Sequence, residues 1–566
     1  MCISGGKFAT IRKGPEFQWR AGVLERINRM DGLAACWILL ITTLLAGNLS
    51  NAPLWRDEAE SALNALTLSS SSLIPKGSAD GNPALLHEMS LYYKTDDPKY
   101  EYLPTHFLET PYVTIHGWLP YYFIRLGMGI FGKNELGPRF FSVIFFGLGL
   151  AVLYVMVREI ASPALALCVV GYCSLMPSLL GYAMQARYYS YTLFFNLLGV
   201  FSFWRFTQSQ SRVRFGVWAA SEVFLYYTYI SAFFLHQAVF ALFVLASRRD
   251  LLKKFTLYGA FVVMFALPHL LVTKFPILAL KIPARHSVDI ESFLMLFSAL
   301  ERNWLLVLSA VAFLLVFIIR KVKNTLCCGS AEKHRDFDSL CFLLVVIGYP
   351  YFSYTSPEPA FWARIFLPVI PFVVYAALSR ISPGGDRNRS FKKLRVVVFA
   401  CIFLFLLVNP TMKDATKIPD LFVLKFKPNQ GQLLDSKWVF DVLKHVESTG
   451  ARNPLILTSF DHFVFAYYSD YEAELVWPLR KEYIDRLDRD FFIVVEDSKL
   501  LLEHCVIFLP KEKPSCLAEG TMKHFPRAAK LPRTDLGNVR IYQHAGGFSY
   551  PGASRPIKGG RPDSTL

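Results

Sequence analysis

Long apolar runs recur along most of this chain and are separated by short polar segments. A helix needs about 20 mostly apolar residues to cross a bilayer. Runs of that kind predict about eleven transmembrane helices, at residues 33–50, 139–157, 161–181, 189–206, 214–230, 231–247, 255–273, 302–319, 339–355, 363–380 and 394–410. We therefore expect an α-helical polytopic membrane protein.

The pattern changes beyond residue 410, where charged helical stretches alternate with short apolar runs. Apolar residues at helical spacing between Leu433 and Val446 predict a helix. Four runs predict buried strands, at Leu455–Thr458, Phe491–Val495, Val506–Leu509 and Val539–Tyr542. The alternation predicts a small α/β domain outside the membrane. The expected divisions are a cytoplasmic segment at 1–32, a transmembrane domain at 33–410 with a first outer loop at 51–138, the α/β domain at 411–545 and a disordered tail at 546–566.

Composition and charge agree with a membrane location. Hydrophobic residues make up 53% of the chain and aromatic residues 15%, which is more than a soluble globular chain needs. The net charge of +16 does not indicate a nucleic-acid partner, because the basic residues cluster in alternate short loops. By the positive-inside rule those loops face the cytoplasm, and the first span is an uncleaved anchor. The segments at 50–137, 274–301 and 356–362, and everything after 411, then face outward.

Two adjacent carboxylates, Asp57 and Glu58, follow the first span on the predicted outer side. Acidic residues favour the dipole at the start of a helix, so the pair could simply begin a surface helix that runs to about Leu68. Neighbouring residues on a helix diverge by about 100°. The two side chains therefore cannot both point into one cavity, and a catalytic role falls mainly on one of them.

Basic side chains on the same predicted side suggest a chemistry. Sugar transfer from a lipid-linked phosphate needs one base for the acceptor's proton and cations for the developing phosphate charge. A second carboxylic acid is unnecessary, since the leaving group is already acidic. Arginines at span ends also snorkel to lipid headgroups, and charge runs are typical of solvated faces. The candidate cations are His116, Arg187, Lys274, Lys281, Arg285, His286 and Arg364.

Several motifs make a family resemblance specific through their order along the chain. They are Trp55-Arg56-Asp57-Glu58-Ala59, His116-Gly117-Trp118-Leu119-Pro120-Tyr121-Tyr122, Phe131 to Ser142, Ala186-Arg187-Tyr188-Tyr189, Tyr227-Thr228-Tyr229 and Arg364-Ile365-Phe366-Leu367-Pro368. Together they resemble the family 39-type glycosyltransferases of the GT-C superfamily, which include protein O-mannosyltransferases and the aminoarabinose transferase of lipid A. The similarity covers residues 30 to 410.

The resemblance implies an inverting transferase that takes its sugar from a polyprenyl-phosphate donor on the outer face of a membrane, here a bacterial plasma membrane. Asp57 would then be the general base and Glu58 a supporting acceptor-side group. The donor phosphate would be bound by Arg187, Arg364, His116, Tyr188, Tyr227 and Arg285. The chain departs from the common pattern at Gly117, Gln185 and Tyr229, positions on the donor side of the expected site. Tyrosines at span ends are also typical of interfacial belts.

Other classes explain less of the sequence. A transporter or flippase would have the spans but not the acidic motif, and it would place ionisable residues at mid-membrane. A polysaccharide polymerase would share the outer site but would use a diphosphate-linked donor. The partners we expect are membrane lipids, the lipid-linked sugar and a glycan, lipid or protein acceptor. No cofactor is certain, and a divalent metal ion at Asp57 or Glu58 stays open, as does a disulfide between Cys505 and Cys516.

Overall fold

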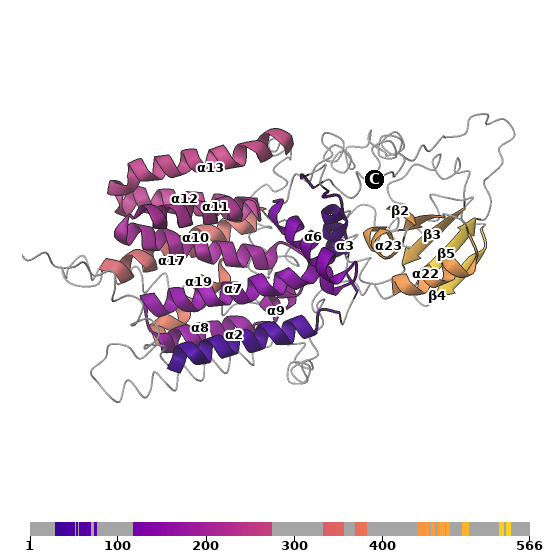
Figure 1. The fold of residues 1–566 in the computed structure, drawn as a ribbon, viewed down its shortest axis with the longest axis horizontal. Helices are drawn as coiled ribbons and strands as arrows, with labels where there is room; N and C mark the ends of the chain where they lie inside the picture. Colours follow the sequence, from indigo (N-terminus) through magenta and orange to yellow (C-terminus); the bar gives the residue numbers. More distant parts are fainter. Residues whose placement is uncertain are drawn as a thin grey trace, which may run out of the picture.

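The computed structural model contains a helical bundle and a smaller sheet domain that lies beyond one end of the bundle (Figure 1). It describes residues 29–50, 53–54, 56–69, 73–75, 117–273, 332–355, 368–381, 438–451, 454–458, 462–469, 471–475, 490–496, 531–536 and 539–544. We call the end of the bundle that faces the sheet domain the site end.

The bundle helices form where the apolar runs predict them. They are α2 (Arg29–Gly47), α7 (Leu136–Ile160), α8 (Pro163–Leu175), α9 (Pro177–Ala183), α10 (Tyr189–Ser209), α11 (Arg212–Tyr226), α12 (Ile230–Ser247), α13 (Leu252–Thr273), α17 (Glu332–Thr355) and α19 (Ile370–Ile381). Within the described residues, four helices are long and apolar enough to cross a membrane: α2, α7, α12 and Arg249–Thr273. The predicted helical, polytopic class is confirmed, while the expected spans at 302–319 and 394–410 lie outside the described residues.

The span expected at 161–181 is two helices rather than one. α8 ends at Leu175 and α9 begins at Pro177. Proline has no backbone N–H and disfavours the helical conformation in the residue before it, and Met176 is extended, with φ −70° and ψ 117°. The prediction of one continuous span was therefore wrong, because hydrophobicity does not register this break in the backbone.

Two short helices lie across the site end of the bundle (Figure 1). α3 (Arg56–Leu66) and α6 (Leu119–Phe131) contribute to one hydrophobic cluster. α6 also packs closely against α7. The two backbones are so near that a Cβ on Gly127 would overlap the carbonyl oxygen of Gly137. This contact requires glycine and holds α6 directly against the start of α7.

The sheet domain contains a mixed five-stranded sheet with the order β2-β1-β3-β5-β4. β1 (Leu455–Thr458) runs parallel to β2 (Glu472–Leu475) and to β3 (Phe491–Glu496). β5 (Val539–His544) runs antiparallel to β3 and to β4 (Arg533–Leu536). Expected strands are present as β1, β3 and β5, whereas the one at 506–509 lies outside the described residues.

The core of the sheet domain is continuous with the site end of the bundle. Helices α22 (Trp438–Ser448) and α23 (His462–Tyr468) supply Val442 and Phe465 to the same buried cluster that contains Ala59 of α3 and Ile124 of α6. Burial of apolar surface stabilises such a contact, so the sheet domain is anchored to α3 and α6.

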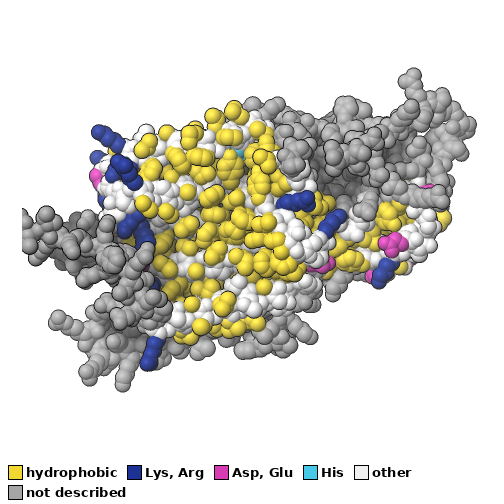
Figure 2. Space-filling model, viewed as in Figure 1, with side chains coloured by type: hydrophobic (Ala, Val, Ile, Leu, Met, Phe, Trp, Pro, Cys, Tyr) yellow, Lys and Arg dark blue, Asp and Glu magenta, His cyan; other side chains and the backbone are white. Residues whose placement is uncertain are grey.

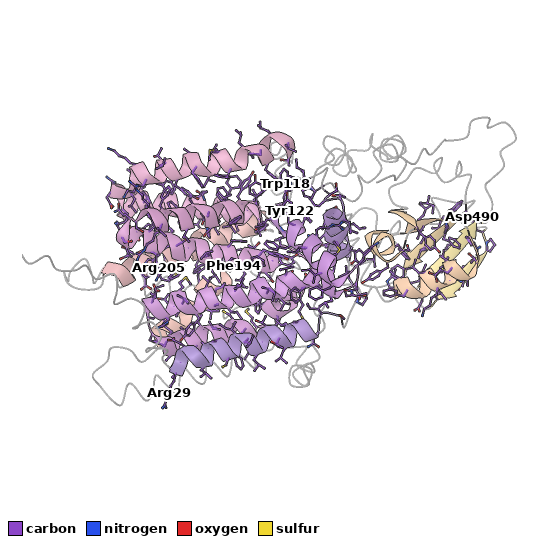
Figure 3. All side chains as sticks on the ribbon, in the orientation of Figure 1. Arg29, Trp118, Tyr122, Phe194, Arg205 and Asp490 are labelled. Carbon is purple, nitrogen blue, oxygen red and sulfur yellow. The ribbon has the colours of Figure 1, made fainter. Side chains whose placement is uncertain are left out.

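Hydrophobic side chains cover much of the visible bundle surface, while Lys and Arg gather mainly at the end remote from the sheet domain (Figure 2). Arg29 and Arg205 lie at that remote end, and Trp118 and Tyr122 lie toward the site end (Figure 3). This distribution agrees with the predicted cytoplasmic loops, because basic residues favour the cytoplasmic side of a membrane protein.

A polar network lies inside the bundle. His236 of α12 contacts Glu222 of α11 (Nδ1 to Oε1, 2.8 Å) and Asn196 of α10 (Nε2 to Oδ1, 2.8 Å). The Asn196 amide donates to the carbonyl oxygen of Pro368, just before α19, at 2.9 Å. All three side chains are fully buried. Buried polar groups are costly without partners, so these contacts tie together the four segments that supply them.

Candidate active site

The acidic pair begins α3 and is asymmetric. Asp57 and Glu58 both lie in the first turn of the helix, yet the Asp57 side chain is 24% exposed and the Glu58 side chain 0%. Successive helical side chains diverge by about 100°, which sends one carboxylate toward the surface of the site and the other into the protein. This is the divergence that the sequence predicts.

Glu58 is held in the interior by two other segments. Arg139 of α7 donates from Nε to Glu58 Oε1 at 2.7 Å and from Nη2 to Oε2 at 2.6 Å. The backbone N–H of Ala186 donates to Oε1 at 2.8 Å. The same guanidinium also donates to the carbonyl oxygens of Leu49 and Pro53, at 2.8 and 2.9 Å. Glu58 and Arg139 thus fasten α3, α7 and the turn before Arg187 to one another.

Arg187 lies in the turn between α9 and α10 and reaches the first turn of α3. Its Nη1 donates to the Asp57 carbonyl oxygen and to Ser61 Oγ, each at 3.0 Å. Its Nη2 lies 3.6 Å from Asp57 Oδ2, and its Nη1 lies 3.9 Å from Glu60 Oε2. The Arg187 side chain is only 6% exposed. Asp57 and Arg187, which the sequence singles out separately, are therefore brought together.

The groups around Arg187 keep its guanidinium protonated. Burial alone would lower the pKa of Arg187, but neighbouring groups, Asp57 first among them, raise this pKa above its ordinary value. Arg187 is therefore a permanent cation. Its Nε–H group is buried and has no hydrogen-bond acceptor among the described residues. Buried donors are nearly always satisfied, which makes this N–H group unusual among the buried polar groups of the site.

The two predicted tyrosines occupy different places. The Tyr188 ring lies 5.5 Å from Arg187 Cζ and stacks on Tyr229, with centroids 4.8 Å apart. Tyr227 is further along the site end, where its carbonyl oxygen accepts from Leu119 N at 2.8 Å and its hydroxyl donates to the carbonyl of Phe265 at 2.7 Å. Tyr188 thus contacts the candidate phosphate ligand, whereas Tyr227 joins α6 to α13.

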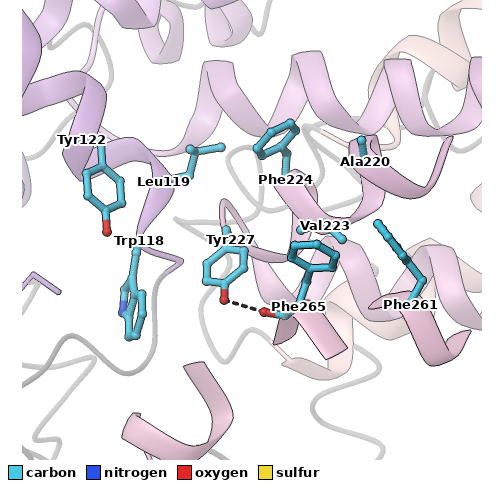
Figure 4. Close-up of a pocket in the computed structure, with 9 residues that line it drawn as sticks. All are labelled: Trp118, Leu119, Tyr122, Ala220, Val223, Phe224, Tyr227, Phe261 and Phe265. Carbon is cyan, nitrogen blue, oxygen red and sulfur yellow. Dashed lines mark hydrogen bonds between the residues drawn. The ribbon is translucent and has the colours of Figure 1, made fainter. Parts of the chain in front are cut away.

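Tyr227 also lines an apolar groove between α6, α11 and α13, with a volume of about 440 Å³. Figure 4 shows aromatic rings along it. The other lining residues are Trp118, Leu119, Tyr122, Ala220, Val223, Phe224, Phe261 and Phe265. Phe224 and Phe265 are both more than 40% exposed. The groove therefore presents apolar rings at the surface where the bundle would meet lipid.

Three predicted site residues, His116, Arg285 and Arg364, lie outside the described residues, as do Cys505 and Cys516. Among the described residues, no group of three or more His, Cys, Asp or Glu side chains is arranged to hold a metal ion. Their cysteines, Cys36, Cys168, Cys173 and Cys341, are free thiols.

Sequence reasoning missed Arg139, Ser61 and Tyr121 as members of the site. Arg139 stands inside a quoted motif, but nothing in the motif says that it pairs with Glu58. Ser61 lies one helical turn after Asp57, and this spacing could have marked it as a neighbour. Tyr121 is 3% exposed, and burial raises the pKa of its hydroxyl, so it remains a neutral group beside the charged ones.

Comparisons with known proteins concern the family and the fold. Residues 115–271 match the family model described as dolichyl-phosphate-mannose-protein mannosyltransferase. A search of the curated proteins finds no match.

Among solved structures, ArnT from Cupriavidus metallidurans in the apo state is similar, with 12% identity and a TM-score of 0.54, covering 90% of this chain and 98% of that one. The same protein bound to undecaprenyl phosphate has 10% identity and a TM-score of 0.52, with the same coverage. The apo oligosaccharyltransferase of Archaeoglobus fulgidus has 11% identity and a TM-score of 0.46, covering 82% of this chain and 69% of that one.

The similarity in fold and the family-model match over residues 115–271 both indicate the same superfamily. The chain has the architecture of the GT-C superfamily of membrane glycosyltransferases, and the resemblance drawn from its motifs is confirmed.

Proposed function

We propose that this protein is an inverting glycosyltransferase that moves a sugar from a polyprenyl-phosphate donor to an acceptor hydroxyl. The contact between Asp57 and Arg187 carries the proposal, since it pairs a partly exposed carboxylate with a permanent cation. Asp57 begins α3, which lies at the site end (Figure 1), opposite most of the basic residues of the bundle (Figure 2). This placement supports a site facing away from the cytoplasm.

Arg187 would bind the donor phosphate. A guanidinium presents five N–H donors in a fork that fits phosphate oxygens, and in Arg187 the contacts to Asp57 and Ser61 use only Nη1 and Nη2. The Nε–H group, which has no acceptor among the described residues, supports an anion as the missing partner. A phosphate there would share the guanidinium with Asp57, which would keep the base close to the reacting carbon.

Asp57 would act as the general base. It takes the proton from the acceptor hydroxyl while that oxygen attacks the anomeric carbon from the face opposite the phosphate. A new carbon–oxygen bond forms, the bond from the anomeric carbon to the phosphate oxygen breaks, and the phosphate leaves with the bonding electrons. Arg187 stabilises the charge that develops on the phosphate. Attack from the opposite face inverts the configuration of the sugar.

The apolar groove would hold the polyprenyl chain. Its lining is aromatic and aliphatic, and it begins beside Trp118 and Tyr227 at the site end. Apolar lining with few polar groups suits an isoprenoid chain. The likeness to ArnT bound to undecaprenyl phosphate supports a donor of this kind.

We assign Glu58 a positioning role instead of the acceptor-side role implied by the resemblance. Its carboxylate is fully buried and accepts from Arg139 and Ala186. Its bond to the Ala186 N–H fixes the residue immediately before Arg187, and its own backbone follows Asp57. Glu58 therefore sets the distance between the proposed base and the proposed phosphate ligand.

Replacement of the base tests the function. In membranes supplied with tritium-labelled polyprenyl-phosphate mannose, Asp57→Asn should lower sugar transfer by about 100-fold or more, because a positioned base contributes 10²–10⁴-fold. The matched control is Asp250→Asn, a carboxylate at the remote end that pairs with Arg248 and should retain activity. Full transfer by a folded Asp57→Asn protein would refute the assignment of the base. Glycan profiles of cells lacking the protein would identify the acceptor class.

A further inference from the structure

Helix α23 of the sheet domain ends in two consecutive tyrosines that contact the site end of the bundle. The Tyr468 hydroxyl accepts from the backbone N–H of Leu54 at 2.7 Å and donates to Glu135 Oε1 at 3.0 Å. The Tyr467 hydroxyl donates to the carbonyl oxygen of Asn134 at 3.2 Å. These bonds join residues separated by more than 330 positions in the sequence.

Both partners of Tyr468 stand just before a site residue. Leu54 precedes Asp57 by three positions, and Glu135 precedes Arg139 by four. Leu54 is fully buried, so its N–H would be left without a partner in the interior if the tyrosine hydroxyl were removed. The Pro53 carbonyl accepts from Arg139. The segment that leads into α3 is thus held from one side by α7 and from the other by α23.

Tyr467 contacts different segments of the bundle from those that Tyr468 contacts. It is 2% exposed, its hydroxyl lies 3.9 Å from Met128 Sδ, and Lys133 Nζ lies 5.4 Å from the centre of its ring. Its contacts are therefore with the end of α6 and the turn into α7. Among the described residues, Tyr467 makes no hydrogen bond to the segment before Asp57, so it anchors the domain without touching the approach to the base.

We propose that Tyr468 is a positioning residue through which the sheet domain sets the place of Asp57. It acts through the backbone of Leu54 on the start of α3, and through Glu135 on the start of α7, where Arg139 holds Glu58. The inference rests on the proposed function, because it assumes that Asp57 is the base. Through Tyr468 the sheet domain would contribute to the geometry of the transferase site.

The two adjacent tyrosines provide a matched test. Tyr468→Phe removes one oxygen and both bonds, and it should lower kcat for transfer from tritium-labelled polyprenyl-phosphate mannose by about tenfold, since small displacements of reacting groups reduce rates steeply. The KM for the donor should change by less than about twofold, because Arg187 is untouched. Tyr467→Phe should keep kcat within about threefold. Hydrogen exchange of the peptide containing Leu54 should accelerate only in Tyr468→Phe.

The outcomes separate this inference from the proposed function. Equal kcat values for the two tyrosine variants, or an unchanged kcat in Tyr468→Phe, would overturn the positioning role even while Asp57→Asn is inactive. An active Asp57→Asn protein would instead overturn the assignment of the base.

If the Tyr468→Phe protein does not fold, a second pair of variants tests the same positioning role. Glu135→Ala leaves the Tyr468 hydroxyl without its acceptor and should lower kcat by about threefold, whereas Glu135→Gln keeps an acceptor oxygen and should restore it. Equal rates in these two variants would also overturn the proposal.

Discussion

Removing Arg139 should destabilise the protein strongly, because its side chain satisfies several buried groups at once. In Arg139→Met, Glu58 keeps only the bond from Ala186 among those described above, and the carbonyls of Leu49 and Pro53 lose their donor. Removing the charged partner of a buried carboxylate costs about 3–5 kcal/mol, and each hydrogen bond lost by a carbonyl costs about 1 kcal/mol. We therefore expect a loss of about 5–7 kcal/mol in the free energy of unfolding.

A double-mutant cycle measures the coupling between the two charges. Glu58→Gln combined with Arg139→Met leaves no unpaired charge, so the double variant should be more stable than the sum of the single losses predicts, by about 2 kcal/mol or more. Equilibrium unfolding by SDS in mixed micelles gives the free energies.

The matched control is the ion pair between Arg205 and Glu159 at the remote end. It has the same chemistry, with Arg205 Nε donating to Glu159 Oε2 at 3.0 Å, but the side chains are 42% and 32% exposed. Exposed pairs contribute about 0–1 kcal/mol. If the two cycles gave the same coupling energy, burial would not be the source of the effect and the reasoning would be wrong.

Two further changes test the donor site. Arg187→Lys keeps the charge but loses the fork that reaches both Asp57 and Ser61, so the KM for tritium-labelled polyprenyl-phosphate mannose should rise about tenfold; an unchanged KM would contradict phosphate binding. Ala220→Trp fills the apolar groove and should slow transfer from a long-chain donor more than from a donor with two isoprene units. Equal slowing of both donors would show that the chain lies elsewhere.

Hydrophobic periodicity predicts most of the described helices, since a span and its approximate length are local properties of the sequence. Hydrophobic periodicity does not predict the break at Pro177, because the proline changes the backbone conformation of one residue, Met176, and leaves the apolar pattern intact. The sheet is partly predicted for the same reason. β1 and β3 are apolar runs, whereas β4 contains Arg533 and Asp535, which pair with each other in solvent, and has no such signal.

The candidate site is predicted in part. Helical geometry predicts that Asp57 and Glu58 diverge, and the motifs mark Arg187. What the residues alone do not reveal is pairing across the chain, because the partner of Glu58 lies 81 positions away and that of Leu54 lies 414 away. Contacts of this range depend on how whole helices pack, which no local pattern records.

The contact between Glu222 and His236 has a consequence for how the chain enters a membrane. α11 has only 15 residues and carries a buried glutamate, and an ionisable side chain in a bilayer costs about 2.5–3.5 kcal/mol. Only three residues, Tyr227 to Tyr229, separate α11 from α12. If the two helices insert together as a hairpin, His236 contacts Glu222 before the glutamate is exposed to lipid. We therefore expect the insertion of α11 to depend on α12, which is synthesised after it.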